Sequence, residues 1–326
     1  MSSLRTALLQ SSGRPGDVEY NLKVLAWAAG DAAGSGAGLL VCPELFLTGY
    51  AIGSGVSELA EPADGESADE VARIAVEHGI AILYGYPERA RQEESASDGG
   101  SAADGGSAAD GGSAADGGSA ADGGSAADGG SAADGGSAAN AESTTYDETT
   151  ATTPVYNSAQ LIGPDGARLA NYRKTHLFGC FEREWFTPGD IPVVQALLDG
   201  VRIGIMICYD VEFPENVRAH ALAGTDLLLV PTAQMHPFQF VAESVIPVRA
   251  FENQMYVAYV NRVGAEGEFE FVGLSCLAGP DGVVRTRAGR AEQMVTADVD
   301  AAFLKESRAD NPYLHDRRAE LYGSLM

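Results

Sequence analysis

Lysine is scarce in this chain of 326 residues: Lys23, Lys174 and Lys305 are lysines, and the other 18 of the 21 basic residues are arginines. The formal net charge is −25, and without the seven aspartates of a repeat described below it is still −18. No basic patch is present, which argues against a nucleic-acid partner. High acidity with so little lysine indicates a halophilic protein, because concentrated salt screens self-repulsion over a few ångströms.

Long apolar runs, paired cysteines and metal-type histidine spacing are also missing. No stretch of about eighteen apolar residues occurs, so we expect no membrane span, and the N-terminus lacks the pattern of a signal peptide. The four cysteines are far apart, without a C-x-x-C pair, which argues against disulfides and zinc and for a reducing compartment. Dinucleotide, P-loop, serine-hydrolase and zincin motifs are absent. We therefore expect a cytoplasmic protein that uses no metal and no cofactor.

One segment of the chain is a repeat. Asp98 to Ala139 consists of seven identical copies of DGGSAA, with no aromatic and no branched aliphatic side chain. Such a segment cannot bury enough surface to offset the entropy of ordering it. We interpret residues 95–153 as a flexible acidic insertion in a single domain spanning 1–326. Long surface loops add little closure entropy, so a fold can tolerate it.

Strand and helix patterns are mixed along the rest of the chain. Short apolar runs predict strands at residues 3–10, 38–42, 80–86, 155–162, 201–207, 226–232, 257–261, 275–278 and 295–298. Helical spacing predicts helices at residues 17–33, 66–78, 214–223 and 238–253. Gly-Pro-Asp-Gly turns at 163–166 and 279–282 indicate hairpins. This mixture predicts a layered α/β domain.

The stretch VRIGIMICYDVEFPE, residues 201–215, carries a candidate nucleophile. The buried strand ends at Cys208, and Pro214 opens a helix just after it. A thiol held at such a junction faces backbone N–H groups that can receive a developing negative charge. This stretch alone is equally consistent with an inert thiol in the core.

Two upstream motifs supply the missing chemistry. PELFLTGY places Glu44 after an apolar run, and YRKTHLFG places Lys174 in a largely apolar setting. With GIMICYDVEFPE, the order and spacing of these motifs resemble those of the nitrilase superfamily of carbon–nitrogen hydrolases. The resemblance spans nearly the whole chain outside the insertion. It implies a four-layer α-β-β-α sandwich and a homodimer or higher homo-oligomer, in which the C-terminal segment 311–322 crosses the partner.

The resemblance also implies roles for these residues. Cys208 would be the nucleophile, Glu44 the general base, and Lys174, with the backbone N–H of Tyr209, would stabilise the oxyanion. A neighbouring ammonium should lower the pKa of the thiol. Taken singly, Glu44 is also typical of a surface acid and Lys174 of a strand-edge lysine.

Further positions follow from the same resemblance. Glu182 is the candidate for a supporting glutamate, although it lies one residue further from the lysine than in some relatives, with Glu184 as the alternative. Gln234, Met235 and His236 follow a buried strand and are candidates for substrate binding; His236 is equally consistent with an exposed loop histidine. We expect Arg249 and Glu252 to pair within the scaffold.

The sequence therefore predicts hydrolysis of a small linear carboxamide to a carboxylate and ammonia through a cysteine thioester. True nitrilases of the superfamily usually carry Trp-Glu after the nucleophile, whereas Tyr209 and Asp210 follow it here. Nitrile hydrolysis and N-carbamoyl-amine hydrolysis remain alternatives. A catalytically silent member that only binds metabolites is an alternative of another class, and the intact Glu-Lys-Cys set argues against it.

Overall fold

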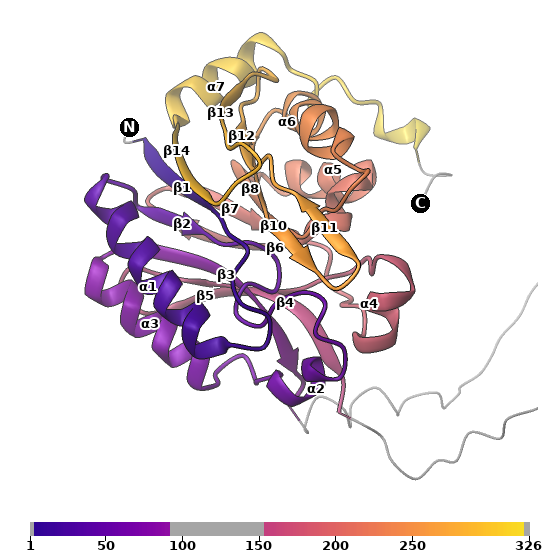
Figure 1. Ribbon diagram of the computed structural model, residues 1–326. Helices are drawn as coiled ribbons and strands as arrows, with labels where there is room; N and C mark the ends of the chain where they lie inside the picture. Colours follow the sequence, from indigo (N-terminus) through magenta and orange to yellow (C-terminus); the bar gives the residue numbers. More distant parts are fainter. Residues whose placement is uncertain (1–2, 92–152, 323–326) are drawn as a thin grey trace, which may run out of the picture. The chain divides into compact units, whose positions relative to one another are not determined.

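Two six-stranded sheets form the centre of the computed structural model, which describes residues 3–91 and 153–322 (Figure 1). These residues belong to a unit comprising 1–95 and 153–326. The predicted insertion at 95–153 lies outside the described residues except for its last position.

The bounds of the elements are as follows. The strands are β1 (Leu4–Gln10), β2 (Leu39–Val41), β3 (Ala81–Arg89), β4 (Val155–Ile162), β5 (Arg168–Arg173), β6 (Val194–Leu198), β7 (Val201–Ile205), β8 (Leu227–Thr232), β9 (Tyr256–Asn261), β10 (Val263–Glu266), β11 (Phe269–Val272), β12 (Cys276–Ala278), β13 (Val284–Arg287) and β14 (Gln293–Val299). The α-helices are α1 (Val18–Gly34), α2 (Gly55–Leu59), α3 (Glu66–His78), α4 (Gly179–Trp185), α5 (Pro214–Leu222), α6 (Ile246–Asn253) and α7 (Ala301–Asp310). Shorter turns of other helix types are η1 (Cys208–Glu212), η2 (Val241–Val245) and η3 (Ala319–Leu321).

The two sheets have the same internal plan. The first runs β14-β1-β2-β3-β4-β5 and the second β13-β12-β9-β8-β7-β6. In each, three central strands are parallel: β1, β2 and β3 in the first, and β7, β8 and β9 in the second. The flanking strands pair antiparallel. The carboxyl ends of parallel strands, where α/β proteins place their ligands, are therefore supplied by both sheets.

Apolar side chains fill three interfaces. The inner faces of both sheets share one cluster, with Leu8, Val41 and Leu83 on one side and Ile205 and Leu229 on the other. Helices α1 and α3 cover the outer face of the first sheet, and α5 and α6 cover that of the second (Figure 1). The layers are thus α-β-β-α, as predicted. No helix among the described residues is both long and apolar enough to traverse a bilayer.

Most predicted elements are present, with two kinds of difference. The helix predicted at 238–253 is a π-helical turn, η2, followed by α6. Pro247 explains the break, because it has no N–H to bond the residue four positions earlier. Short or half-exposed elements escaped prediction: α2, α4, α7, β6 and the β10–β11 hairpin. Strands β5 and β13 were indicated only as the second strands of the two hairpins. Their apolar periodicity is too weak or too brief to recognise.

Candidate active site

Lys174 directly follows β5, and its ammonium is enclosed by two carboxylates. Nζ donates to Glu44 Oε1 at 2.8 Å and to Glu182 Oε1 at 2.6 Å, and all three side chains are fully buried. Burial lowers the pKa of Lys174, but the charges of Glu182 and Glu44 outweigh burial and hold the pKa well above its ordinary value. Lys174 therefore remains a cation inside the protein.

Glu44 lies on the loop after β2 and has one oxygen engaged and one open. Asn157 Nδ2 donates to Oε1 at 2.7 Å, beside the ammonium. Within the described residues, Oε2 has no hydrogen-bond partner. The loop passes directly over Gly85 of β3, where a Cβ would lie 2.5 Å from the Leu45 nitrogen, so only glycine permits this approach. A buried carboxylate oxygen without a donor is well suited to accept a proton.

Arg262, which the sequence analysis missed, anchors the Glu44 loop from the second sheet. It follows β9, is fully buried, and donates from Nη1 to the carbonyls of Glu44 at 3.2 Å and Leu45 at 3.3 Å. It also pairs with Glu266, whose Oε2 accepts from the Tyr50 N–H at 2.7 Å. Leu45 has a φ of +48°, which an L residue adopts only at a cost of about 1–3 kcal/mol. These bonds stabilise the loop in that conformation.

Cys208 begins η1, three residues beyond the end of β7. Its backbone is also in the left-handed region, with a φ of +49°. Sγ lies 3.8 Å from Gln234 Oε1, and the residue is 7% exposed. The expected lowering of the thiol pKa is wrong. Burial and the charge of Glu44 raise the pKa of Cys208, and the opposing effect of Lys174 does not prevail. The resting side chain is therefore a neutral thiol with a carboxylate near it.

Asp210 ties the Cys208 turn to the Lys174 loop. Its buried carboxylate accepts from the Ile207 N–H at 3.1 Å, from the Tyr172 hydroxyl at 2.8 Å and from the His176 N–H at 2.9 Å. In the sequence alone, Asp210 serves only to distinguish branches of the superfamily. Its role in positioning depends on contacts 34 and 38 residues away in sequence.

The two candidate supporting glutamates lie in different environments. Glu182 is buried on α4 and accepts from the Tyr50 hydroxyl at 2.9 Å and the Phe178 N–H at 2.8 Å, besides Lys174. Burial raises the pKa of Glu182, Lys174 opposes this, and Glu44 adds to it. Glu184, the alternative, is exposed. The structure thus brings Glu182, and not Glu184, to the lysine.

The other predicted site residues differ in burial. Tyr209 is half-buried, with its ring edge-on to Phe178 at 5.3 Å. Gln234 is 6% exposed beside Cys208, and Met235 is 7% exposed in an apolar cluster with Tyr50. His236 is exposed, and its Nε2 lies 3.5 Å from Arg290 Nη1. The structure therefore brings Gln234 to the thiol and leaves the His236 ring at the surface.

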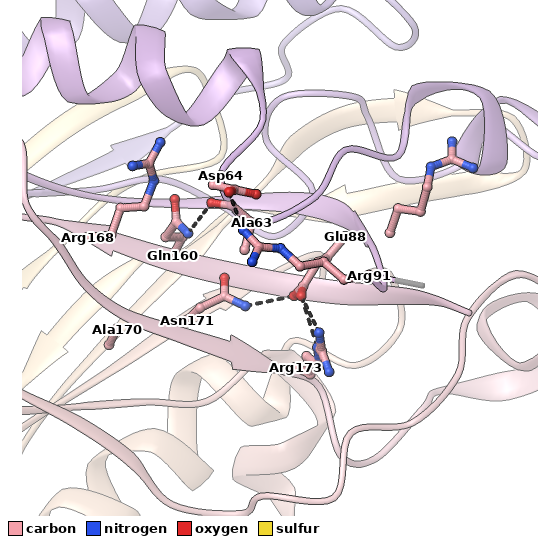
Figure 2. Close-up of a pocket in the computed structure, with 10 residues that line it drawn as sticks. Ala63, Asp64, Glu88, Arg91, Gln160, Arg168, Ala170, Asn171 and Arg173 are labelled. Atoms are coloured by element: carbon pink, nitrogen blue, oxygen red, sulfur yellow. Dashed lines mark hydrogen bonds and ion pairs between the residues drawn. The ribbon is translucent and has the colours of Figure 1, made fainter. Parts of the chain in front are cut away.

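A separate cavity of about 320 Å³ lies on the outer face of the first sheet (Figure 2). Four arginines line it, but its central group is Glu88, which accepts from Arg173 at 2.5 and 3.0 Å and from Asn171 at 2.7 Å. At its rim Arg91 pairs with Asp64. The charged side chains that line this cavity are largely paired with one another, so the cavity does not indicate a particular ligand. No metal-binding group of three or more His, Cys, Asp or Glu occurs within the described ranges.

Comparison with known proteins places these residues in a family context. The family model "Carbon-nitrogen hydrolase" matches residues 5–104 and 124–309. A Pseudomonas protegens protein described as "Hydrolase in pqqF 5'region" is 42% identical over 328 residues, covering 100% of this chain and 93% of that protein. An (R)-stereoselective amidase from Pseudomonas is 31% identical over 325 residues, covering 98% of this chain and 93% of the amidase.

Solved structures of a nitrilase-superfamily amidase from Nesterenkonia are also similar. One superposes with a TM-score of 0.73 at 28% identity, covering 100% of this chain and 98% of that one. Others hold acrylamide or butyramide, and one carries the acetamide moiety of fluoroacetamide on the active-site cysteine.

Proposed function

The chain belongs to the carbon–nitrogen hydrolases of the nitrilase superfamily, and from that premise we propose that it hydrolyses a small linear carboxamide to a carboxylate and ammonia. Cys208, Glu44 and Lys174 are the proposed catalytic residues, and Glu182 supports the lysine. The observation that carries the proposal is the buried ammonium between two carboxylates, one of which keeps an open oxygen near a thiol.

The first half of the reaction is acylation. As the Cys208 sulfur attacks the amide carbon, Glu44 takes the thiol proton, so the unfavourable free thiolate never accumulates. Lys174 and the Tyr209 N–H stabilise the oxyanion of the tetrahedral intermediate. Glu44 then gives the proton to the leaving nitrogen, ammonia departs, and a thioester remains.

The second half is deacylation. Glu44, ionised again, removes a proton from water, which attacks the thioester carbon. Lys174 stabilises the second oxyanion in the same position. Collapse expels the sulfur, which regains its proton from Glu44, and the carboxylic acid leaves. One amide and one water give one acid and one ammonia, with the protein unchanged.

A substrate panel tests the proposal. Acrylamide and butyramide, which the Nesterenkonia amidase binds, are compared with matched nitriles and N-carbamoyl amines. We expect ammonia and carboxylate from the amides. Preferred release of ammonia from nitriles, or of carbon dioxide with ammonia from carbamoyl compounds, would establish the corresponding alternative. No turnover of any member would favour a silent binding protein.

Labelling separates the nucleophile from the other thiols. Fluoroacetamide should add one acetamide moiety, by loss of fluoride, and peptide mapping should locate it on Cys208. Cys180 is an internal control because it is exposed, whereas Cys42 and Cys276 are buried. Labelling of Cys180 alone would indicate simple surface alkylation and contradict the assignment.

We also propose that the protein is a homo-oligomer. Leu222 on α5, Val248 and Phe251 on α6, and Leu321 near the C-terminus are all at least 39% exposed. Exposed apolar side chains of this size are typical of contact surfaces. Light scattering after size exclusion should give at least twice the chain mass, and a monomer at micromolar concentration would contradict this.

A further inference from the structure

The ammonium of Lys174 has one N–H group that the two carboxylates do not use. A lysine ammonium carries three N–H donors. Glu44 and Glu182 accept at 2.8 and 2.6 Å, and no third acceptor among the described residues bonds Nζ. No other cationic side chain in these ranges donates to either carboxylate, and Arg249 pairs instead with Glu252 at 2.9 Å, as the sequence predicts. Because two N–H groups are fixed, the two carboxylates determine where the third one points.

The orientation of Glu182 depends on a residue that is distant in sequence. Its donors in the described part of the chain are Lys174, the Phe178 N–H and the Tyr50 hydroxyl. The first two lie eight and four residues away, in the segment that leads into α4, whereas Tyr50 lies 132 residues away. The hydroxyl donates at 2.9 Å to Oε1, the oxygen that also accepts from Lys174. Tyr50 therefore fixes this oxygen from outside the α4 segment.

Tyr50 is itself held at its backbone and around its ring. Its N–H donates to Glu266 Oε2 at 2.7 Å, that of Ala51 donates to the same oxygen at 3.0 Å, and Glu266 pairs with Arg262. Three aromatic rings contact the ring of Tyr50, with centroids 5.6, 5.5 and 5.9 Å away: those of Phe181, Phe269 and Phe271. Tyr50 is 2% exposed. The position of its hydroxyl is thus set by contacts other than the one with Glu182.

We propose that Tyr50 is a positioning residue for the reaction: its hydroxyl orients Glu182, and Glu182 directs the remaining N–H of Lys174 towards the oxyanion. The inference rests on the proposed function for its chemistry. Tyr50 acts through Glu182 and not on the substrate. The base and the oxyanion donor are aligned together, because the Arg262–Glu266 pair that holds the base loop also holds Tyr50.

The test removes the hydroxyl and keeps the ring. In Tyr50→Phe, Lys174 is the sole remaining donor to Glu182 Oε1 among the described residues, so the carboxylate turns with the lysine. The oxyanion forms only after the sulfur has attacked, so a misdirected donor slows the chemical step more than it weakens substrate binding. We expect kcat to fall about 10- to 100-fold, with KM within about threefold of native.

Tyr84→Phe is the matched control. Tyr84 lies on β3 and is fully buried, and its hydroxyl donates to Gln160 Oε1 at 2.7 Å. Each variant therefore loses one buried hydroxyl and its hydrogen bond to a side-chain oxygen, so the two melting temperatures should fall by similar amounts. Both kcat and KM of Tyr84→Phe should stay near their native values.

The reactivity of the thiol separates the direction of the lysine from general damage to the site. Methyl methanethiolsulfonate has no carbonyl, so its reaction with Cys208 needs the thiol and a base but no oxyanion donor. The sulfur takes the methylthio group, and methanesulfinate leaves. Peptide mapping follows the rate at Cys208, with exposed Cys180 as the reference. In Tyr50→Phe this rate should be close to that of the native protein.

Three results would overturn the proposal: an unchanged kcat in folded Tyr50→Phe, a rise in KM alone, or a loss of Cys208 labelling equal to the loss of kcat. If Tyr50→Phe does not fold, Phe269→Ala decides. It loosens the packing of the Tyr50 ring and keeps the hydroxyl, and Phe269 is only partly buried. Here too kcat should fall while KM stays near native, and an unchanged kcat would contradict the positioning role.

The choice of substrate keeps the two proposals apart. Kinetics are measured on the best substrate of the panel described above. If that substrate is a nitrile or a carbamoyl compound, amide hydrolysis fails, and the comparison of Tyr50→Phe with Tyr84→Phe still decides the role of Tyr50, because each reaction passes through an anionic adduct. If the native protein hydrolyses no member, both proposals fail. Hydrolysis of butyramide with the same kcat in native and Tyr50→Phe proteins overturns only the second.

Discussion

Arg173 and Lys174 are neighbours in sequence at the end of β5, and each pairs with glutamate, but the two clusters differ in completeness. On the outer face, Glu88 has both oxygens satisfied: Oε1 by Arg173, and Oε2 by Ser158 and Asn171, each at 2.7 Å. On the inner face, Lys174 joins two carboxylates, and Glu44 Oε2 has no partner among the described residues.

The two clusters therefore differ in hydrogen bonding: both carboxylate oxygens of Glu88 have donors, whereas one oxygen of Glu44 has none among the described residues. A fully satisfied network stabilises a fold, whereas an unpaired buried oxygen costs free energy. Stability alone would favour a donor for Glu44 Oε2, so the open oxygen indicates a function. The two cations agree with this interpretation. The guanidinium of Arg173 suits bidentate pairing with Glu88, and the compact ammonium of Lys174 suits an oxyanion.

Removal of the Cys208 thiol should produce the largest effect, because the inner cluster has no other nucleophile. Cys208→Ala should lower amide turnover to the background rate, while the melting temperature stays within a few degrees, since only one small atom is deleted. Ammonia release and thermal unfolding are measured on the same sample. Turnover that survives in well-folded Cys208→Ala protein would remove the inner cluster from catalysis.

Exchange of the two cations tests the comparison directly. In Lys174→Arg the guanidinium should fork onto Glu44 and Glu182 and block the carbonyl, so that kcat/KM falls about 100- to 1,000-fold or more. In the matched Arg173→Lys variant we expect turnover within about threefold of native, since a partly exposed pair contributes about 1 kcal/mol or less. Similar activity of both variants would mean that Lys174 is an ordinary structural lysine.

Neutralisation of the two carboxylates should separate stability from activity. Glu88→Gln should lower the free energy of unfolding by about 1–3 kcal/mol, because the ion pair between the buried Glu88 carboxylate and Arg173 is lost. Its kcat/KM should change little. Glu44→Gln should show the reverse pattern, with turnover lost and the fold retained. Urea unfolding and steady-state kinetics are measured for both variants. A severe catalytic defect in Glu88→Gln would mean that the inner cluster depends on the outer one.

Salt should give the smallest and most general effect. Between 0.01 M and 1 M salt the Debye length falls from about 30 Å to about 3 Å, which relieves the self-repulsion of a chain at −25. We expect the melting temperature to rise. The difference in melting temperature between the native and Glu88→Gln proteins should become smaller at high salt. Arg173 is 27% exposed, so salt screens its attraction to Glu88. A melting temperature that is constant over this range would refute the halophilic interpretation.

Prediction from sequence succeeded where the signal was local. The apolar runs before Glu44 and Cys208 are visible in a few adjacent residues, and each contains a strand. The strand before Lys174, β5, is not an apolar run and was indicated only by the turn that precedes it. The layered class followed from the alternation of strand and helix patterns.

Prediction failed where the property depends on distant partners. Asn157 and Arg262 contact the Glu44 loop from positions 113 and 218 residues away. Asn157 is a polar residue within a largely apolar strand and could have been suspected; Arg262 gives no local signal. The pKa of Cys208 was predicted in the wrong direction because the sequence indicates its charged neighbours but not the extent of its burial.

The anchoring of Leu45 by Arg262 bears on the order in which the protein becomes active. Glu44 and Lys174 lie on the first sheet, but the guanidinium that shapes the base loop arrives on the second, late in the chain. During synthesis Glu44 and Lys174 are made long before Arg262 and before β14, the last strand of the first sheet. The left-handed turn at Leu45 therefore has no anchor until both sheets have docked. We therefore expect activity only from a chain in which Arg262 has been made and the second sheet has docked.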